Sequence, residues 1–419
     1  MPETNKIADA VERIAKKGFT HKFGKPEIEV KNNPAWQQLR ELGTKLWLDT
    51  GDINVASDLW CSQFEALTTN NSLLNKEVQK GIYDDLIKTV ASEIKNSSPD
   101  IDQKGLLLEI AFVLNAYHAL RLVEVFDANV SVELHTDLGN NVERSVEYAL
   151  RFYRICPERF YIKVPLTPAG LLAARKLSQQ EIPVNLTLGF SARQNYVATQ
   201  LAQPNYVNVF MGRLNAFVAN NGLGDGINVG EKATLATQKH LLQLRKEGKT
   251  KSLLIGASMR GASQVVSLAG LDVFTMPPKV AADYNENPSD SVTSAIKNDP
   301  VVSLSEGVKF EDFNATTLWD VPEEFKACVD ALLKKNIDGL TPSDIQSHFA
   351  DAGLGDLFPK WTNEDIQTIT ADGKIPVYDK WKDKLSTGQI GLDTLMNISA
   401  FYSFATDQKA LDERTKSLL

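Results

Sequence analysis

Lys163 lies in the middle of an apolar, strand-like stretch, residues 159–165 (RFYIKVP). Aromatic and β-branched residues that end at a proline favour a short strand here. A lysine is rarely buried unless it is paired or neutral, so an ion pair or an exposed edge strand explains Lys163 most simply. A buried lysine without a carboxylate partner would instead have a lowered pKa and could attack a carbonyl to form a Schiff base. The stretch by itself favours the ion pair or the exposed edge.

Several other strand-like stretches carry polar residues on one face only. Successive residues of a strand face opposite sides, so each of these stretches has an apolar face and a face with a polar residue near its end. In the stretch 253–257 we assign Gly256 and the following Ser258 to the polar face, and Ile255 and Ala257 to the apolar one. A parallel strand that is covered on both sides is apolar nearly throughout, so the polar set indicates a site. It comprises Asp49, Glu133, Lys163, Asn185, Thr187, Ser258 and Arg260.

Some of these side chains could together perform Schiff-base chemistry. Lys163 is the candidate nucleophile, because burial would help its amine to lose a proton. Glu133 and Thr187, on the neighbouring strands, could hold the water that exchanges protons with a carbinolamine. Asp49 is the remaining free carboxylate, and we expect it to accept the proton of a substrate hydroxyl when a carbon–carbon bond breaks.

Other polar residues of the same region suit hydroxyl and phosphate groups of a substrate. Asn70 and Asn185 could form hydrogen bonds with substrate hydroxyls. Arg213 and Arg260 follow the sixth and seventh strands, on the side where barrels often bind phosphate, and the guanidinium fork suits a phosphate group. A surface ion pair is the simpler explanation for either arginine taken alone.

The elements that must position these residues alternate between strands and helices. Eight strands separated by helices predict an α/β fold with a parallel sheet, which we expect to close into a (β/α)8 barrel; an open, doubly wound sheet is the alternative. We expect two helices within residues 73–128 and an exposed loop over 215–230. The predicted strands are 46–50, 64–69, 129–134, 160–165, 184–188, 206–210, 253–257 and 272–275.

The strand pattern also divides the chain into three parts. Residues 1–44 form a helical N-terminal segment, and residues 45–280 form the barrel core. The strand pattern stops at Pro277, and prolines then punctuate a helical stretch. We interpret residues 281–419 as a helical extension that ends in a helix packed on the barrel; a small separate domain is the alternative.

Composition excludes several classes of function. The 419-residue chain has a net charge of -8, which argues against a nucleic-acid-binding surface. Three widely spaced cysteines predict free thiols and no cysteine zinc site, as in a reducing cytoplasm. The first residues lack the apolar core of a signal peptide, and the most apolar stretch, 105–123, is interrupted by charges that favour a packed helix over a membrane span. We therefore expect a cytoplasmic protein with no membrane or nucleic-acid partner.

Seven short motifs lie in order on the first seven predicted strands. They are LDTGD (48–52), TTNNSL (68–73), VSVE (130–133), IKVP (162–165), VNLTL (184–188), FMGR (210–213) and GASMR (256–260). In this order they resemble the transaldolases, the Schiff-base enzymes of the pentose phosphate pathway. Transaldolases carry the lysine on strand four, whereas deoxyribose-phosphate aldolase carries it on strand six. The segment FYSFATDQKAL (401–411) also looks like the closing helix of the family.

The resemblance implies a reaction and a set of ligands. A ketose phosphate such as fructose 6-phosphate would form an imine with Lys163, lose an aldose phosphate, and leave a dihydroxyacetone unit for an acceptor such as erythrose 4-phosphate. No metal or organic cofactor is implied, and the oligomeric state is left as monomer or homodimer. The implied catalytic residues are Lys163, Asp49, Glu133 and Thr187, and the implied substrate-binding residues are Asn70, Ser72, Asn185, Asn208, Phe210, Arg213, Ser258 and Arg260.

Two positions separate alternatives within this superfamily. Fructose-6-phosphate aldolases, which release dihydroxyacetone, tend to have glutamine in place of Glu133 and tyrosine in place of Phe210, so both positions favour the transferase. Asn208 departs from the usual serine that contacts the donor's C1 hydroxyl. His135 is also atypical, and we interpret it as a hydrogen-bonded histidine at a strand end; a pocket residue is the alternative. The alternatives are an aldolase-type lyase and a catalytically inactive barrel that acts as a binding protein.

Overall fold

Eight parallel strands form a closed barrel, joined in the order β1 to β8, in the computed structural model, which describes residues 3–419. The closed barrel confirms the predicted fold class, and the open sheet is wrong. Each predicted strand end lies within one residue of the observed one. The strands are β1 (Lys45–Asp49), β2 (Phe64–Thr68), β3 (Asn129–Glu133), β4 (Phe160–Pro165), β5 (Val184–Thr187), β6 (Tyr206–Phe210), β7 (Leu253–Ala257) and β8 (Val273–Met276).

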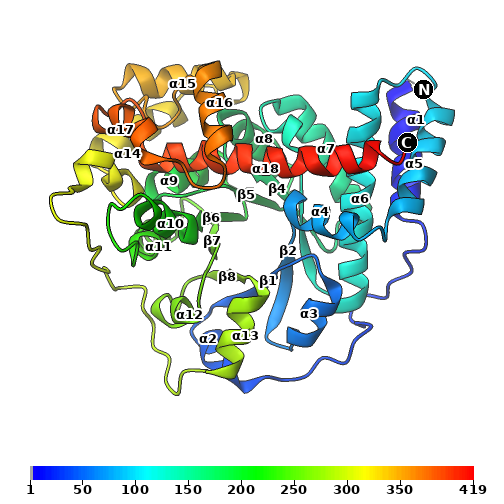
Figure 1. The fold of residues 1–419 in the computed structure, drawn as a ribbon, viewed down its shortest axis with the longest axis horizontal. Coiled ribbons are helices and arrows are strands. Elements are labelled where there is room, and N and C mark those ends of the chain that lie inside the picture. Colours follow the sequence, from blue (N-terminus) through cyan, green and yellow to red (C-terminus); the bar gives the residue numbers. More distant parts are fainter. Residues whose placement is uncertain (1–2) are drawn as a thin grey trace.

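Helices connect the strands and surround the barrel (Figure 1). Two expectations were wrong here: residues 73–128 contain parts of three helices, and the loop predicted over 215–230 is shortened because α10 continues to Asn220. The helices of this part are α1 (Glu3–Ala15), α2 (Gln37–Glu41), α3 (Ile53–Leu59), α4 (Asn71–Gln79), α5 (Asp84–Ser97), α6 (Gln103–Phe126), α7 (Val142–Ile155), α8 (Pro168–Ser178), α9 (Ala192–Leu201), α10 (Met211–Asn220), α11 (Val229–Lys246), α12 (Ser263–Ser267) and α13 (Pro278–Glu286), with short 3₁₀ turns η1 (Pro34–Trp36) and η2 (Thr136–Leu138).

Helix α6 contains the most apolar stretch of the chain. It is long and apolar enough to span a membrane, yet 83% of its most apolar window is buried inside the protein. It packs against β3, α1 and α5, so its apolar residues belong to the core around the barrel.

A layer of aromatic rings fills the barrel beneath the strand ends. Trp47, Tyr161 and Tyr206 point inward and contact one another, with ring centroids 4.7–5.8 Å apart. Each ring lies two residues before a polar residue of the same strand, namely Asp49, Lys163 or Asn208. Because side chains two residues apart share a face, the rings form an apolar floor directly below the polar residues.

The helical extension packs on the barrel through its last helix. Figure 1 shows α18 running across the molecule from the α14–α17 helices to the N-terminal helices. It contacts α4, α6 and α16, and Arg414 near its end donates to Asp84 of α5 at 2.8 Å. The extension comprises η3 (Phe310–Phe313), η4 (Ala315–Leu318), α14 (Glu323–Leu333), η5 (Ile337–Gly339), α15 (Pro342–Asp351), α16 (Asn363–Asp372), α17 (Tyr378–Ser386) and α18 (Leu392–Lys416).

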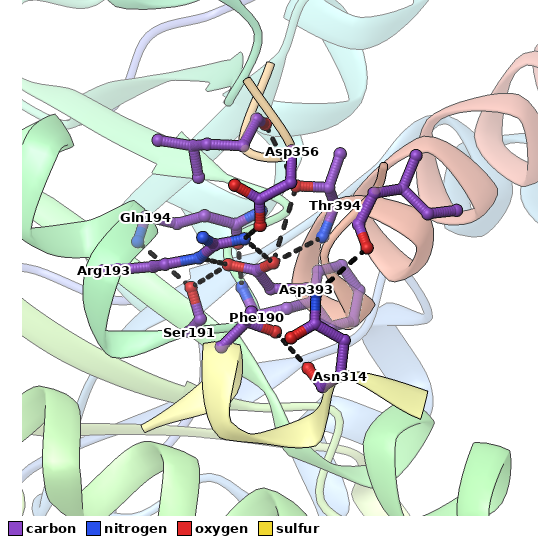
Figure 2. A network of polar contacts seen from close by, with 11 residues as sticks. Phe190, Ser191, Arg193, Gln194, Asn314, Asp356, Asp393 and Thr394 are labelled. Carbon is purple, nitrogen blue, oxygen red and sulfur yellow. Dashed lines mark hydrogen bonds and ion pairs between the residues drawn. The ribbon is translucent and has the colours of Figure 1, made fainter. Parts of the chain in front are cut away.

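A buried arginine joins the barrel to this extension (Figure 2). Arg193 of α9 donates from Nη2 and Nε to the carboxylate of Asp393 at 2.8 and 2.9 Å, and its Nη2 lies 2.7 Å from the carboxylate of Asp356. The Ser191 hydroxyl donates to the same Asp393 carboxylate at 2.6 Å. Because Arg193 and Asp393 are fully buried or nearly so, this network holds the start of α18 in one place on the barrel.

Candidate active site

A cavity of about 400 Å³ opens among the carboxyl ends of the strands. This is the end of a (β/α)8 barrel at which such enzymes hold their sites. Every predicted site residue except Glu133 lines it. The lining residues include Asp49, Asn70, Ser72, Lys163, Asn185, Thr187, Asn208, Phe210, Arg213, Ser258 and Arg260.

Lys163 is buried without an ionic partner. Its side chain is 4% exposed, and its Nζ donates to the main-chain oxygen of Thr69 at 3.0 Å. Among residues 6–419, whose side chains the structure describes, no carboxylate oxygen lies within 4.0 Å of this amine. Both simple explanations of Lys163, the ion pair and the exposed edge, are therefore wrong. The amine lies at the surface of the cavity, and the hydrogen bond that it donates goes to the neutral carbonyl of Thr69.

Glu133 lies beside Lys163 and is buried, but it is not among the residues that line the cavity. The two residues are direct partners in the β3–β4 register, and one Glu133 oxygen accepts a hydrogen bond from the main-chain N–H of Asn71 at 3.0 Å. Burial raises the pKa of Glu133, and the charge of Asp49 raises it further, whereas Lys163 and the Asn71 N–H lower it in part. A carboxyl with a raised pKa close to an amine is suited to proton transfer.

Thr187 and Asp49 offer two different kinds of polar group. The Thr187 hydroxyl is fully buried and has no hydrogen-bond partner within the described part of the chain. A buried hydroxyl without a partner costs stability, and such groups are typical of functional sites.

Asp49 accepts a hydrogen bond from Thr68 at 2.7 Å, and Thr68 in turn contacts Thr275 at 2.6 Å. This pair of threonines fixes the Asp49 carboxylate at the cavity surface.

The Asn208 amide is already used inside the protein. Its Nδ2 donates to Asn185 at 3.3 Å, and its Oδ1 accepts from the main-chain N–H of Gly189 at 3.2 Å. Asn185 then donates to Ser131 at 3.1 Å. The residue that departs from the family pattern thus orients Asn185, in addition to lining the cavity.

Arg213 and Arg260 come together although they follow different strands. A side-chain carbon built on Gly212 would lie 3.0 Å from the Nε of Arg260 and 2.1 Å from the main-chain oxygen of Ser258, so only glycine allows this approach. Burial and the charge of Arg260 lower the pKa of Arg213 to about 10, with Asp407 opposing the shift. Burial also lowers the pKa of Arg260, and Asp49 opposes it. A buried guanidinium and a more exposed one, which lie close together and repel each other, form a site for an anion.

The assignment of faces on β7 was wrong. Ile255 and Ala257 face the barrel interior and line the cavity, whereas a side-chain carbon on Gly256 would contact Leu271, Met211 and Phe274 outside it. Ser258 still reaches the cavity because its backbone adopts the left-handed region, with φ of 62°. This turn directly after the strand breaks the alternation on which the prediction rested.

The structure adds residues to the cavity that the strand pattern does not reveal. Phe404 and Asp407 come from α18, Lys76 from α4, and Lys374 and Ile375 from the extension. The resemblance of segment 401–411 to a closing helix was a signal for the first two. Lys374 had no such signal, because it lies far along the chain from any strand.

His135 lies outside this cavity, as expected of a hydrogen-bonded histidine. Its Nδ1 accepts from the Asp137 N–H at 3.1 Å, and its Nε2 lies 3.3 Å from the Asp412 carboxylate. Ser72, by contrast, lines the cavity and donates to Asp407 of α18. The two contacts attach α18 to the barrel at separate points.

Comparison with known proteins bears on what this cavity does. The transaldolase/fructose-6-phosphate aldolase family model matches residues 46–337. A transaldolase of Xanthomonas euvesicatoria is 27% identical over 64% of this chain and 89% of the relative. A transaldolase of Protochlamydia amoebophila is 29% identical over 59% of this chain and 77% of the relative, and one of Rhizobium leguminosarum is 28% identical over 64% and 84%. These similarities identify a transferase enzyme with sugar-phosphate substrates. The chain therefore belongs to the transaldolase/fructose-6-phosphate aldolase family.

Proposed function

We propose that this enzyme transfers a dihydroxyacetone unit from a ketose phosphate to an aldose phosphate through a Schiff base on Lys163, as a step of the pentose phosphate pathway. The observation that carries the proposal is the buried Lys163 amine, which has no ionic partner in the described part of the chain and shares one cavity with two adjacent arginines. The amine suits a carbonyl, and the arginines suit a phosphate at the other end of the same molecule.

Imine formation uses the groups around Lys163. The lone pair of its amine attacks the C2 carbonyl carbon of the donor; the nitrogen loses a proton and the carbonyl oxygen takes one up, which gives a carbinolamine. The carbinolamine oxygen then leaves as water when the imine forms. Glu133, with its raised pKa, and the Thr187 hydroxyl supply and remove these protons through a water held between them.

Bond cleavage then uses the second carboxylate. Asp49 takes the proton of the C4 hydroxyl, the C3–C4 bond breaks, and its electron pair passes into the imine to give an enamine on Lys163. The aldose phosphate leaves, and the enamine attacks the aldehyde of the acceptor by the reverse of these steps. The aromatic floor of Trp47, Tyr161 and Tyr206 keeps bulk water from the enamine from below.

One observation favours the transferase over a lyase that releases dihydroxyacetone. Phe210 lines the cavity, and its ring has no hydroxyl that could protonate the enamine. If the enamine were protonated, it would return to an imine, and hydrolysis of that imine would release dihydroxyacetone without transfer to an acceptor. An enamine that is not protonated survives until an acceptor arrives.

Trapping the imine tests the proposal directly. The enzyme is incubated with fructose 6-phosphate, reduced with borohydride and digested, and mass spectrometry locates the dihydroxyacetone-derived adduct. We expect it on the Lys163 peptide, and we expect Lys163→Ala to lose at least about 10³-fold in rate. An adduct on another residue, no adduct at all, or near-normal turnover of Lys163→Ala would each refute the assignment. A coupled assay with and without erythrose 4-phosphate then separates transfer from cleavage.

A further inference from the structure

We propose that Lys374, which the helical extension brings to the cavity, is a third cationic ligand of the substrate phosphate and a determinant of selectivity for phosphorylated sugars. This inference rests on the proposed function of the cavity as a sugar-phosphate site. Lys374 lies between α16 and α17, outside the barrel strands, and it lines the same cavity as Arg213 and Arg260.

The main chain around Lys374 is held in place by the barrel and by α18. Its carbonyl oxygen accepts hydrogen bonds from the Nη1 of Arg213 at 3.3 Å and from the hydroxyl of Ser399 at 3.4 Å. Asn221, at the end of α10, donates to the Pro376 carbonyl at 3.0 Å and accepts from the Tyr378 N–H at 2.9 Å. One of the phosphate-site arginines therefore positions the loop, and the loop adds Lys374 to the lining of the same cavity.

The Lys374 ammonium has no ionic partner among the side chains of residues 6–419, although nearby lysines do. Lys380 and Lys384 of the same extension pair with Asp372 and Asp365 at 2.5 Å. Lys374 is exposed, and no carboxylate lies within 4.0 Å of it in the part of the chain that the structure describes. An unpaired ammonium at the edge of a cavity that already holds two guanidinium groups favours a ligand of two negative charges.

A second lysine that lines the cavity, Lys76, provides a comparison for Lys374. Lys76 of α4 follows β2, whereas Arg213 follows β6, so Lys76 enters from the opposite side of the closed barrel. Both lysines add one positive charge to the cavity mouth. If only the overall charge mattered, removing either lysine would have the same effect, whereas direct contact with the phosphate predicts a larger effect for Lys374.

The test measures selectivity between erythrose 4-phosphate and erythrose as acceptors. For Lys374→Ala we expect the ratio of the two kcat/KM values to fall about tenfold, mostly through a higher KM for the phosphorylated acceptor. Lys374→Arg should restore most of the ratio. Lys382→Ala is the matched control, because Lys382 is an exposed lysine of α17 outside the cavity, and its ratio should equal that of the wild type.

Two results would overturn the inference. One is an unchanged ratio in Lys374→Ala, and the other is a loss of equal size in Lys76→Ala, which would indicate a general field. Borohydride trapping on Lys163 in the same Lys374→Ala variant keeps this outcome separate from the proposed function. If Lys374→Ala still gives the Lys163 adduct and its ratio of kcat/KM values is unchanged, only the role of Lys374 is rejected. If the wild-type enzyme gives no adduct, the proposed function itself is rejected.

Discussion

Glu133 lies near two groups, Lys163 and Asp49, whose charges act on its pKa in opposite directions. Burial disfavours the charged form of Glu133, Asp49 adds repulsion, and Lys163 partly offsets both. The Thr187 hydroxyl lies fully buried in the same region and has no hydrogen-bond partner among the described residues. These features lower stability, and they are useful only if a reaction intermediate provides the missing partners.

Removing the Thr187 hydroxyl should separate stability from activity. In Thr187→Val a methyl group replaces a buried hydroxyl that has no protein partner, so we expect the free energy of unfolding to stay within about 1 kcal/mol of the wild type or to rise. The rate of imine formation should fall about 10²-fold, because the hydroxyl would no longer help to hold the catalytic water. Urea denaturation and single-turnover trapping measure the two effects. A clear loss of stability together with a normal turnover rate would contradict the expectation for stability and the expectation for activity.

Glu133→Gln should change the pH dependence of stability. The pKa of Glu133 is raised in the folded state, so its contribution to stability is present below the unfolded pKa and is lost as the pH rises through the folded pKa. Glutamine keeps an oxygen for the Asn71 N–H but does not ionise. We therefore expect the variant to gain stability relative to the wild type as the pH rises, and its rate to fall about 10²-fold. Urea titrations at several pH values would show a constant difference if the raised pKa were absent.

Strands and helices supply the positions that these residues need. Register pairs Glu133 with Lys163 and Lys163 with Asn185, so three neighbouring strands place one functional group each at the same height. The extension contributes from a distance, through α18 and the loop that carries Lys374. The buried Arg193 network is the joint between these two parts.

Removing Arg193 should weaken that joint. In Arg193→Met the buried carboxylate of Asp393 loses its main partner, and we expect the free energy of unfolding to fall by about 3–5 kcal/mol. Arg175→Met is the matched control, because Arg175 also connects the barrel to the extension, through Asp338, but in an exposed ion pair. Urea denaturation of the two variants measures how much stability each one loses. Equal losses in both would mean that burial of Arg193 adds nothing.

The whole molecule is acidic, yet the mouth of its cavity is basic. The net charge is -8, whereas Lys76, Arg213, Arg260 and Lys374 line a cavity with few carboxylates. A cavity with low-dielectric walls focuses this local field, so phosphorylated substrates are attracted despite the overall charge. The field extends over about one Debye length and weakens as salt is added.

Added salt should therefore lower kcat/KM for phosphorylated substrates more than for unphosphorylated ones. Between ionic strengths of about 0.01 M and about 0.15 M we expect kcat/KM for erythrose 4-phosphate to fall several-fold, mainly through KM. The value for unphosphorylated erythrose should change little and serves as the control. Equal salt effects on both acceptors would show that the basic mouth does not act on the phosphate.

Much of this site could be predicted because strand alternation is a local property. Apolar residues at every second position give the strand boundaries, and polar residues near the strand ends indicate a common mouth once the strands are parallel. Asp49, Glu133, Lys163 and Thr187 were found in this way, and the order of the motifs then indicated the family. All of these inferences use neighbours in the chain or the order of the elements.

Only the tertiary structure decided which residues far apart in the chain would meet. The faces of β7 are opposite to the predicted ones, and only the left-handed turn at Ser258 brings this residue to the cavity. The burial of Lys163 without an ion pair to a described carboxylate became visible only when its surroundings were placed. Lys374 joins the cavity because Arg213 and Ser399 hold its main chain there. Such contacts depend on packing between segments that no local pattern relates. Alternation along the chain thus determined the barrel and its polar mouth, and packing in space determined which charges face one another within it.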